Sequence, residues 1–205
     1  MTSSQDLSLD ARRTAVVIID VQNDYCHPSG LFSRNGLRLE GLDRLVEMIN
    51  ALVRTARAAG TPVIWVRMEW ADDVSVGLLA ERSEFLRHEG LRKGTWGSEL
   101  VAGLSIDEGD HQIVKPRFSG FYRTDLEETL RQLDVTTLVM AGVRTDFCVE
   151  STVRDAFFRD FDVVVAQDAV NGYFPELHHN SLRVMHTVFA RVCPVDRIAT
   201  ALEQG

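Results

Sequence analysis

Three residues with the chemistry of an acid, an amine and a thiol each close or follow a short apolar run of the chain. Asp20 ends the run "TAVVIID", Lys115 ends "HQIVK", and Cys148 follows "TLVMAGV" at the start of a polar, helix-opening segment. Only a thiolate attacks a carbonyl carbon well, so a thiol needs a group that accepts its proton and a cation that stabilises the anion. Each residue also has an ordinary interpretation. Cys148 could be a core residue, Asp20 a turn cap and Lys115 a solvated strand end.

The segments that position these residues alternate between β-branched runs and amphipathic runs. The strand candidates are apolar on both faces, which is typical of parallel strands covered by helices on both sides. They span residues 14–20, 62–68, 111–115, 137–143 and 162–168, with a short sixth strand near 190–195. Helices are predicted over 42–60, where Gly60 supplies a left-handed cap, over 123–134, after Thr145, and over 176–190. The pattern predicts an α/β fold with a doubly wound, mostly parallel six-stranded sheet.

The domain organisation follows from the absence of repeats, low-complexity segments and breaks in composition. We expect a single domain over residues 1–205, with 1–13 as a flexible N-terminal segment. The connection from about Glu69 to Asp110 exceeds an ordinary loop between a strand and a helix. It is expected to hold short helices that cover one end of the sheet.

In an open parallel sheet, ligands bind beyond the carboxyl ends of the strands. Asp20, Lys115 and Cys148 all fall at that edge, so we expect their side chains to meet there. A helix N-terminus and a neighbouring ammonium both lower the pKa of a thiol. Cys148, two residues into its predicted helix, is therefore expected to have a lowered pKa, with Asp20 as its proton acceptor.

Composition excludes several classes of partner. The formal net charge of −8 argues against nucleic acid and against an anionic membrane surface, and no apolar run is long enough to span a bilayer. The three cysteines have no CxxC spacing, and an odd number cannot form a complete disulfide framework. The N-terminal segment lacks the apolar core of a signal peptide. These features favour a cytoplasmic protein with a small-molecule ligand.

Three stretches together resemble the isochorismatase-like cysteine hydrolases. They are "VVIIDVQNDY", "KPRFSGFYRTDLEETLR" and "AGVRTDFCVESTVRDA", in the order and at the approximate spacing of that family. The resemblance runs from about Thr14 to Phe189. It implies a catalytic triad in which Cys148 attacks an amide-type carbonyl, Asp20 acts as general base and then acid, and Lys115 holds both in place, with a thioester intermediate.

The resemblance also implies details of the backbone and of the assembly. It maps a cis peptide bond onto Val143–Arg144, and it implies that the backbone N–H groups of Arg144 and Cys148 form the oxyanion hole. Relatives are commonly homodimers or homotetramers, so a homo-oligomer is expected.

Differences within the family favour one group of reactions. Vinyl ether hydrolases do not need the cysteine, whereas this chain keeps Cys148. Nicotinamidases carry a metal site with histidines after the second strand, but here that region reads "RMEWADDVSV". We therefore predict no catalytic metal and no cofactor, and we favour amidases of carbamoyl and ureido compounds such as N-carbamoylsarcosine, ureidoacrylate and biuret.

Other residues are candidates for contact with the substrate. Arg144 could bind a substrate carboxylate in a forked pair, or point to solvent or a neighbouring subunit. Gln22 could orient the substrate or simply form a turn. Aromatic residues could wall the pocket or belong to the core, and those predicted to contact the substrate are Phe32, Trp96 and Phe118. A metal role for His178 and His179 is not favoured.

Three alternatives to an amidohydrolase stay open on the sequence. One is a vinyl ether hydrolase of the isochorismatase type. Another is a non-catalytic domain of the same fold that binds a ligand or partner, although the intact set of acid, amine and thiol argues against it. The third is a redox-sensing protein in which Cys148 pairs with Cys26.

Overall fold

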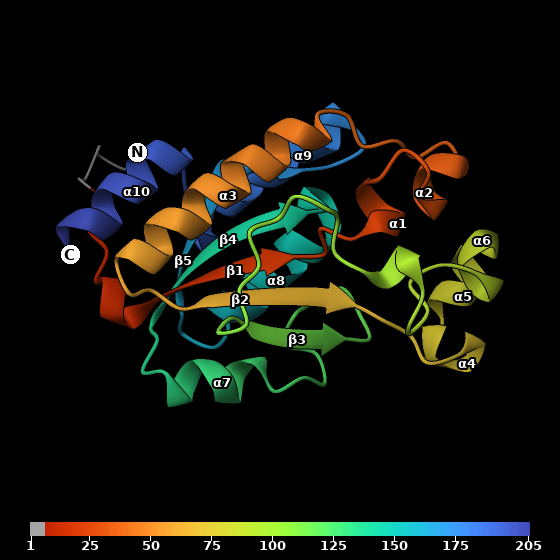
Figure 1. The fold of residues 1–205 in the computed structure, drawn as a ribbon, viewed down its shortest axis with the longest axis horizontal. Helices are drawn as coiled ribbons and strands as arrows, with labels where there is room; N and C mark the ends of the chain where they lie inside the picture. The colour runs from red at the N-terminus through yellow and green to blue at the C-terminus, as the bar shows by residue number, and fades with distance from the viewer. Residues whose placement is uncertain (1–6) are drawn as a thin grey trace.

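The protein is built on a sheet of six parallel strands in the order β3-β2-β1-β4-β5-β6 (Figure 1). A computed structural model describes residues 7–205. The chain starts in the middle of the sheet, moves out to β3, and then returns past β1 to build the other half from β4. The order therefore reverses between β1 and β4, which is the topological switch point of an open α/β sheet. The strands are β1 (Thr14–Ile19), β2 (Val63–Met68), β3 (His111–Lys115), β4 (Thr137–Val143), β5 (Asp162–Asn171) and β6 (Arg191–Cys193).

The strands agree closely with those predicted from the apolar runs. β3 and β4 have the predicted bounds, and the α/β class with helices on both faces is confirmed. β5 is longer than predicted and continues to Asn171, with a register shift against β4 between Met140 and Gly142. Every strand of the described sheet is parallel to its neighbours, so no antiparallel edge is present there.

Helices cover both faces of this sheet. On one face α3 (Leu42–Ala58) packs against the strands with α10 (Val195–Gln204) beside it, and α8 (Glu150–Phe157) lies on the other. The buried positions of α3 recur at helical spacing, from Leu45 and Ile49 to Val53 and Ala56, and the helix ends before Gly60 at φ 73° as predicted. The remaining longer helices are α7 (Leu126–Gln132) and α9 (Pro175–Val184), which continues into η4 (Met185–Phe189).

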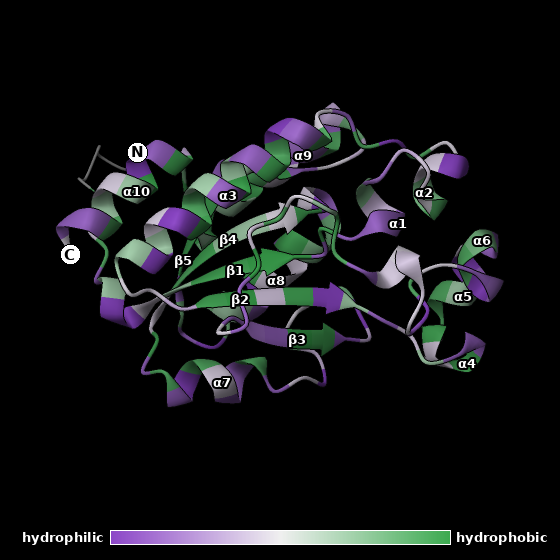
Figure 2. Ribbon diagram, in the orientation of Figure 1, coloured by the Kyte–Doolittle hydropathy of each residue, from purple (hydrophilic) through white to green (hydrophobic). Residues whose placement is uncertain are grey.

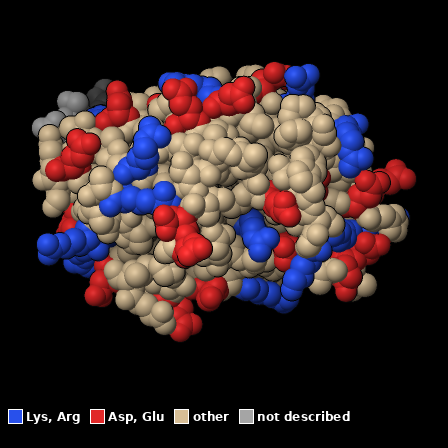
Figure 3. All heavy atoms as spheres, in the orientation of Figure 1, with Lys and Arg blue, Asp and Glu red and all other residues tan. Residues whose placement is uncertain are grey.

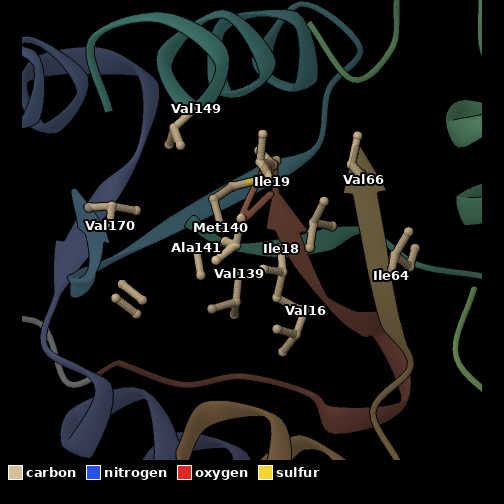
Figure 4. Close-up of a cluster of buried hydrophobic side chains, with 14 of the residues drawn as sticks. Val16, Ile18, Ile19, Ile64, Val66, Val139, Met140, Ala141, Val149 and Val170 are labelled. Atoms are coloured by element: carbon tan, nitrogen blue, oxygen red, sulfur yellow. The ribbon is translucent and has the colours of Figure 1, made fainter. Parts of the chain in front are cut away.

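The core lies between these layers. Figure 4 shows β-branched side chains of β1, β2, β4 and β5 packed together, with Val149 directed into the same cluster. Colouring by hydropathy shows the central strands as the apolar centre and the outer helix surfaces as mixed (Figure 2). Val149 is fully buried and follows Cys148 directly, so the core anchors the turn that carries the thiol.

Short helices gather at the carboxyl ends of the strands; those in the long connection after β2 were predicted, and two more follow β1. In Figure 1 they form the right-hand end of the molecule. They are α1 (Asn23–Cys26), α2 (Leu31–Arg34), α4 (Asp73–Val76), α5 (Leu79–Arg82), α6 (Glu84–His88) and η2 (Trp96–Ser98). This cover shields the strand ends from solvent, so groups placed there can be buried.

The predicted flexible segment over residues 1–13 is wrong for residues 7–13, which are part of the packed structure. Residues 1–6 lie outside the described residues. Leu9 and Ala11 are buried, and the Asp10 side chain caps η1 (Ala11–Arg13) by accepting a hydrogen bond from the N–H of Arg12. The apolar side chains of Leu9 and Ala11 bury against the core, which fixes this stretch.

The molecular surface carries both signs of charge. On the face shown in Figure 3, acidic and basic side chains are intermingled rather than separated into one basic stripe. Within residues 7–205, no helix is long and apolar enough to cross a bilayer.

Candidate active site

Asp20, Lys115 and Cys148 lie at the carboxyl ends of β1, β3 and β4, and the sheet order reverses between β1 and β4. Asp20 follows β1 directly with φ 54°, and its N–H donates to the carbonyl of Val66 on β2. Lys115 is the last residue of β3, which lies two strands away from β1. Neighbouring strands are about 4.8 Å apart, so only a long side chain can cross β2 to reach Asp20. The lysine stem provides that reach.

The carboxylate and the ammonium form a buried ion pair. Nζ of Lys115 donates to Oδ2 of Asp20 over 2.7 Å and to the carbonyl of Arg117 over 3.0 Å, and both charged side chains are fully buried. Oδ1 of Asp20 is also buried and accepts no conventional hydrogen bond among the described residues. Burial raises the pKa of the Asp20 carboxyl, while Lys115 and the Cys148 thiol oppose that shift in part. A carboxylate in this setting is a stronger base than one in water.

Cys148 lies on the turn Thr145–Val149, which we call the thiol turn. This turn has π-helical geometry, starts after the N-cap Arg144 and continues into α8. Cys148 is thus the fourth residue of the helical segment, deeper than predicted. It is 2% exposed, and burial raises the pKa of its thiol, with the negative charge of Asp20 adding to the rise and Lys115 countering only part of it. The predicted lowering of this pKa is wrong, because burial and the charge of Asp20 outweigh the ammonium of Lys115.

The backbone that leads into the thiol turn is unusual. The peptide bond between Val143 and Arg144 is cis. The carbonyl of Arg144 accepts hydrogen bonds from the N–H groups of Phe147 and Val149, both over 3.1 Å. Just upstream, Gly142 has φ 111°, and a β-carbon there would lie 2.1 Å from the carbonyl oxygen of Ile19. Only glycine therefore lets β4 approach β1 this closely at the switch point.

The Arg144 side chain is held rather than free. Its Nη2 binds the Asp146 carboxylate over 2.6 Å, and its Nε approaches the other oxygen at 3.3 Å. The guanidinium carbon lies 4.2 Å from the ring centre of Phe147 and 4.5 Å from that of Tyr173. With 12% of the side chain exposed, the solvent-directed alternative is wrong. Nε and Nη2 are occupied by Asp146, and no described partner holds Nη1.

Gln22 has a structural role instead of the predicted contact with substrate. Its amide nitrogen donates to the carbonyls of Met68 and Ser98, each over 2.8 Å, and its oxygen accepts from the N–H of Met68. The side chain is fully buried. Both N–H donors of the amide and one acceptor site of its oxygen are used to tie the ends of β1 and β2 to η2, so the side chain is committed to the structure of this end of the sheet.

Phe118 lies beside the thiol turn, as a pocket-wall residue should. Its ring contacts Phe147 edge-on at 5.3 Å between centres, and it lines a hollow of about 320 Å³ together with Met68 and Trp70. Phe147 directly precedes Cys148 and is partly exposed. The sequence interpretation included Phe118 but missed Phe147, although its position next to the thiol could have indicated it.

Phe32 belongs to a buried aromatic cluster that includes two tyrosines missed from the sequence. Its ring lies 4.6 Å from Tyr25 and 5.8 Å from Tyr173. Burial raises the pKa of both tyrosines, and the charge of Cys148 acts on both in the same direction. The Tyr25 hydroxyl donates only to the sulfur of Met68, a weak acceptor. Phe32 therefore packs against two tyrosines whose pKa values respond to Cys148.

Trp96 lies apart from the three reactive groups. It is 48% exposed and lines a separate open hollow of about 810 Å³ with His27, Glu99 and the start of α3. None of Asp20, Lys115 and Cys148 lines that hollow. Its predicted contact with substrate is not supported by this placement, because the sequence could not tell on which side of η2 the indole points.

The histidines do not form a metal site. Nδ1 of His178 lies 2.9 Å from the hydroxyl of Thr145, and His179 approaches the carbonyl of Pro175. Within residues 7–205, no group of three or more His, Cys, Asp or Glu side chains is arranged to hold a metal ion.

The fold and the site together define an α/β protein in which an acid, an amine and a thiol meet in one buried cluster at the switch point of a parallel sheet. A family model described as the isochorismatase domain matches residues 14–197. The chain belongs to the isochorismatase family.

Individual relatives span nearly all of the chain. It is 37% identical to a ureidoacrylate amidohydrolase RutB of Methylobacterium radiotolerans, over 97% of this chain and 83% of the relative. A crystal structure of a cysteine hydrolase from Pseudomonas syringae pv. phaseolicola superposes with a TM-score of 0.88 at 26% identity, covering 98% of this chain and 99% of that one. N-carbamoylsarcosine amidase from Thermoplasma acidophilum superposes with a TM-score of 0.73 at 27% identity, covering 90% and 97%.

Proposed function

We propose that this protein is a metal-independent cysteine amidohydrolase that cleaves the C–N bond of a small carbamoyl, ureido or amide compound through a thioester. The observation that carries the proposal is the convergence of Asp20, Lys115 and Cys148 in one buried cluster. Family membership and a curated amidohydrolase relative along almost the whole chain make it a hydrolase of carbon–nitrogen bonds other than peptide bonds.

The first half of the reaction forms the thioester. Asp20 takes the proton of the Cys148 thiol as Sγ attacks the carbonyl carbon, so a C–S bond forms and the carbonyl electrons move onto oxygen. The raised pKa of the Asp20 carboxyl supports this role, because it narrows the gap between the pKa of the carboxyl and that of the Cys148 thiol. When the tetrahedral intermediate collapses, the C–N bond breaks and the protonated Asp20 gives its proton to the leaving nitrogen.

The second half regenerates the enzyme. Asp20 removes a proton from water as the water oxygen attacks the thioester carbon, and collapse of that intermediate breaks the C–S bond and returns the proton to the thiolate. Lys115 stays charged and keeps the carboxylate oriented through its Nζ. The N–H groups of Arg144 and Cys148 are proposed as the donors to the oxyanion, and one such donor is typically worth about 3 kcal/mol.

The substrate class is narrowed by the surroundings of the thiol. The aromatic walls of Phe118, Phe147 and Tyr173 suit a flat, conjugated group such as a ureido or acrylamide unit. Arg144 is proposed to offer its Nη1 edge to a substrate carboxylate, with Asp146 holding the other edge. A ureido acid, the type of compound named for the curated relative, combines both features.

The wider context of the enzyme is part of the same proposal. We propose one hydrolase domain, acting in the cytoplasm as a homodimer or homotetramer on a small molecule. The support is the family resemblance, the net charge of −8 and the match of one family model along residues 14–197.

The experiment is an ammonia-release screen over carbamoyl, ureido and primary amide compounds with purified protein. Wild type should turn over at least one ureido or carbamoyl compound, and Cys148→Ala should be at background on it. Cys193→Ala is the matched control, because Cys193 is also a buried free thiol but lies on β6. Vinyl ethers release no ammonia and are assayed separately by loss of the ether; their turnover by Cys148→Ala would instead identify a vinyl ether hydrolase.

A further inference from the structure

Two of the three family-like stretches contain residues that the reaction above does not use. The stretch after Lys115 contains Ser119 and Gly120, and the stretch after Cys148 contains Thr152 and Asp155. The structure brings these four residues together between the loop that follows β3 and the helix α8.

Thr152 connects the two segments through a single hydroxyl. Its Oγ1 donates to the carbonyl of Cys148 over 2.7 Å and accepts from the N–H of Gly120 over 3.0 Å. The side chain is fully buried, so water does not compete for either bond. A threonine hydroxyl that bonds the carbonyl four residues back is common in helices, but the bond to Gly120 is an additional one to another segment.

The Gly120 side of this contact is closely packed. A β-carbon at Gly120 would lie 3.2 Å from Cγ2 of Thr152 and 3.2 Å from a methyl carbon of Leu126. The neighbouring Ser119 hydroxyl donates to the carboxylate of Asp155, and it accepts from the N–H of Phe121. The loop is therefore fastened to α8 at two successive residues.

The same loop also holds the amine of the site. The carbonyl of Arg117 accepts a hydrogen bond from Nζ of Lys115, and Phe118 packs on Phe147 of the thiol turn. Movement of Gly120 away from α8 would shift the Arg117 carbonyl and, with it, the lysine. Through Thr152, the backbone of Cys148 is tied to the segment that positions Lys115.

We propose that Thr152 is a positioning residue that sets the Cys148 thiol relative to the Lys115–Asp20 pair. The hydroxyl fixes the carbonyl of Cys148 against the loop that follows Lys115. Both α8 and this loop then determine the distance from Sγ of Cys148 to the Asp20 carboxylate. Asp155 and Ser119 secure the same loop one residue earlier in the chain. The inference rests on the proposed function for its kinetic consequence, but not for its effect on the thiol.

The test uses an isosteric pair of variants. Thr152→Val removes the hydroxyl and keeps the shape, whereas Thr152→Ser keeps the hydroxyl. Thr187→Val is the matched control, because Thr187 makes the same bond to the carbonyl four residues back, with Arg183, on an exposed helix surface. Three quantities are measured: kcat and KM, the iodoacetamide alkylation rate of the Cys148-containing peptide by mass spectrometry, and the midpoint of thermal unfolding.

We expect Thr152→Val, which removes both hydrogen bonds of the hydroxyl, to lower kcat at least tenfold with little change in KM, and to shift the Cys148 alkylation rate away from the wild-type value. Thr152→Ser should recover most of both, and Thr187→Val should change neither. A Thr152→Val variant that melts earlier but keeps kcat and alkylation at wild-type values would overturn the proposal, as would failure of Thr152→Ser to recover them.

Ser119→Ala is measured instead if Thr152→Val does not fold, because Ser119 secures the same loop. It is expected to lower kcat with little change in KM, and unchanged kcat and alkylation would overturn the proposal. If wild type turns over no amide, the proposed function fails, but the alkylation comparison among the Thr152 variants still decides the positioning role, because it needs no substrate.

Discussion

Lys115 and Asp20 form a fully buried ion pair across an intervening strand, with Nζ and Oδ2 2.7 Å apart. Of the 22 lysines and arginines of the chain, only Lys93 and Lys115 are lysines, and Lys93 is exposed. An ammonium on an unbranched stem can cross β2 and places one compact charge between Oδ2 of Asp20 and the carbonyl of Arg117, whereas a guanidinium is planar and forked. The choice of lysine at this one buried position is therefore a matter of shape as well as charge.

Replacing that lysine should affect stability and activity together. Lys115→Met leaves Asp20 buried without its partner, which typically costs about 3–5 kcal/mol. Lys115→Arg should also lose most activity, because a planar fork does not reproduce the contacts of one compact ammonium. Urea unfolding and kcat/KM measure the two effects. Lys93→Met and Lys93→Arg are the controls and should behave as wild type; equal behaviour of the Lys115 and Lys93 variants would contradict the role of the buried pair.

The pH dependence follows from the directions of two pKa shifts. Asp20 must be ionised to accept a proton, and burial raises its pKa from the ordinary 3.8, so the acid limb of kcat/KM should lie above that value. The Cys148 pKa is raised above 9.0, so alkylation of the thiol should stay slow from neutral pH to pH 9.0. In Lys115→Met the acid limb should move to still higher pH, since the ammonium lowers the Asp20 pKa. An alkylation midpoint below pH 9.0 would mean that the thiol ionises more easily than its surroundings indicate.

Arg144 gives a test of substrate charge. If its Nη1 edge binds a carboxylate, Arg144→Ala should raise KM about tenfold for ureido acids and leave neutral ureas and amides unchanged. Arg154→Ala is a matched control, since Arg154 is held in the same way by Glu150 and lies over the ring of Phe189 at 4.3 Å, but on α8. Equal KM changes for acidic and neutral substrates would remove Arg144 from substrate recognition.

The sequence was sufficient to predict the strands and the meeting of Asp20, Lys115 and Cys148 at one edge of the sheet, for a physical reason. A parallel strand buried on both faces needs a continuous apolar run, so its end is visible as the first polar residue, and Asp20 and Lys115 mark such ends directly. The partners of Gln22 could not be predicted, because they lie 46 and 76 residues away and depend on how η2 folds over β1 and β2.

Electrostatic details were also beyond the sequence. The Cys148 pKa depends on how completely the cover at the sheet end excludes water, which no local pattern encodes. The Arg144–Asp146 pair is local, but its position between two rings requires Tyr173, which follows β5. The folded chain decides such contacts by bringing distant segments together.

Metal independence is tested by chelation. The acidic residues after β2 are already committed to other partners: Asp72 caps α4, Asp73 binds Arg92 and His88, and Glu69 pairs with Arg67. Prolonged dialysis against a chelator should therefore leave kcat and KM unchanged. Loss of activity that zinc or iron restores, and that magnesium does not, would contradict the prediction.

Asp20 and Cys148 should fail as a unit, because in the proposed reaction both act on the same proton as the same bond forms and breaks. Cys148→Ala removes the nucleophile and should reduce turnover to background, and Cys148→Ser should be nearly as inactive, since an alcohol is far harder to ionise than a thiol. Asp20→Asn keeps the shape but cannot accept the proton, so acylation and protonation of the leaving group should both suffer. The losses should not add: Asp20→Asn combined with Cys148→Ala should be no worse than Cys148→Ala alone. Single-turnover assays with mass spectrometry of the acyl-enzyme measure this directly, and a double variant much slower than Cys148→Ala would show that Asp20 works in a step that does not involve the thiol.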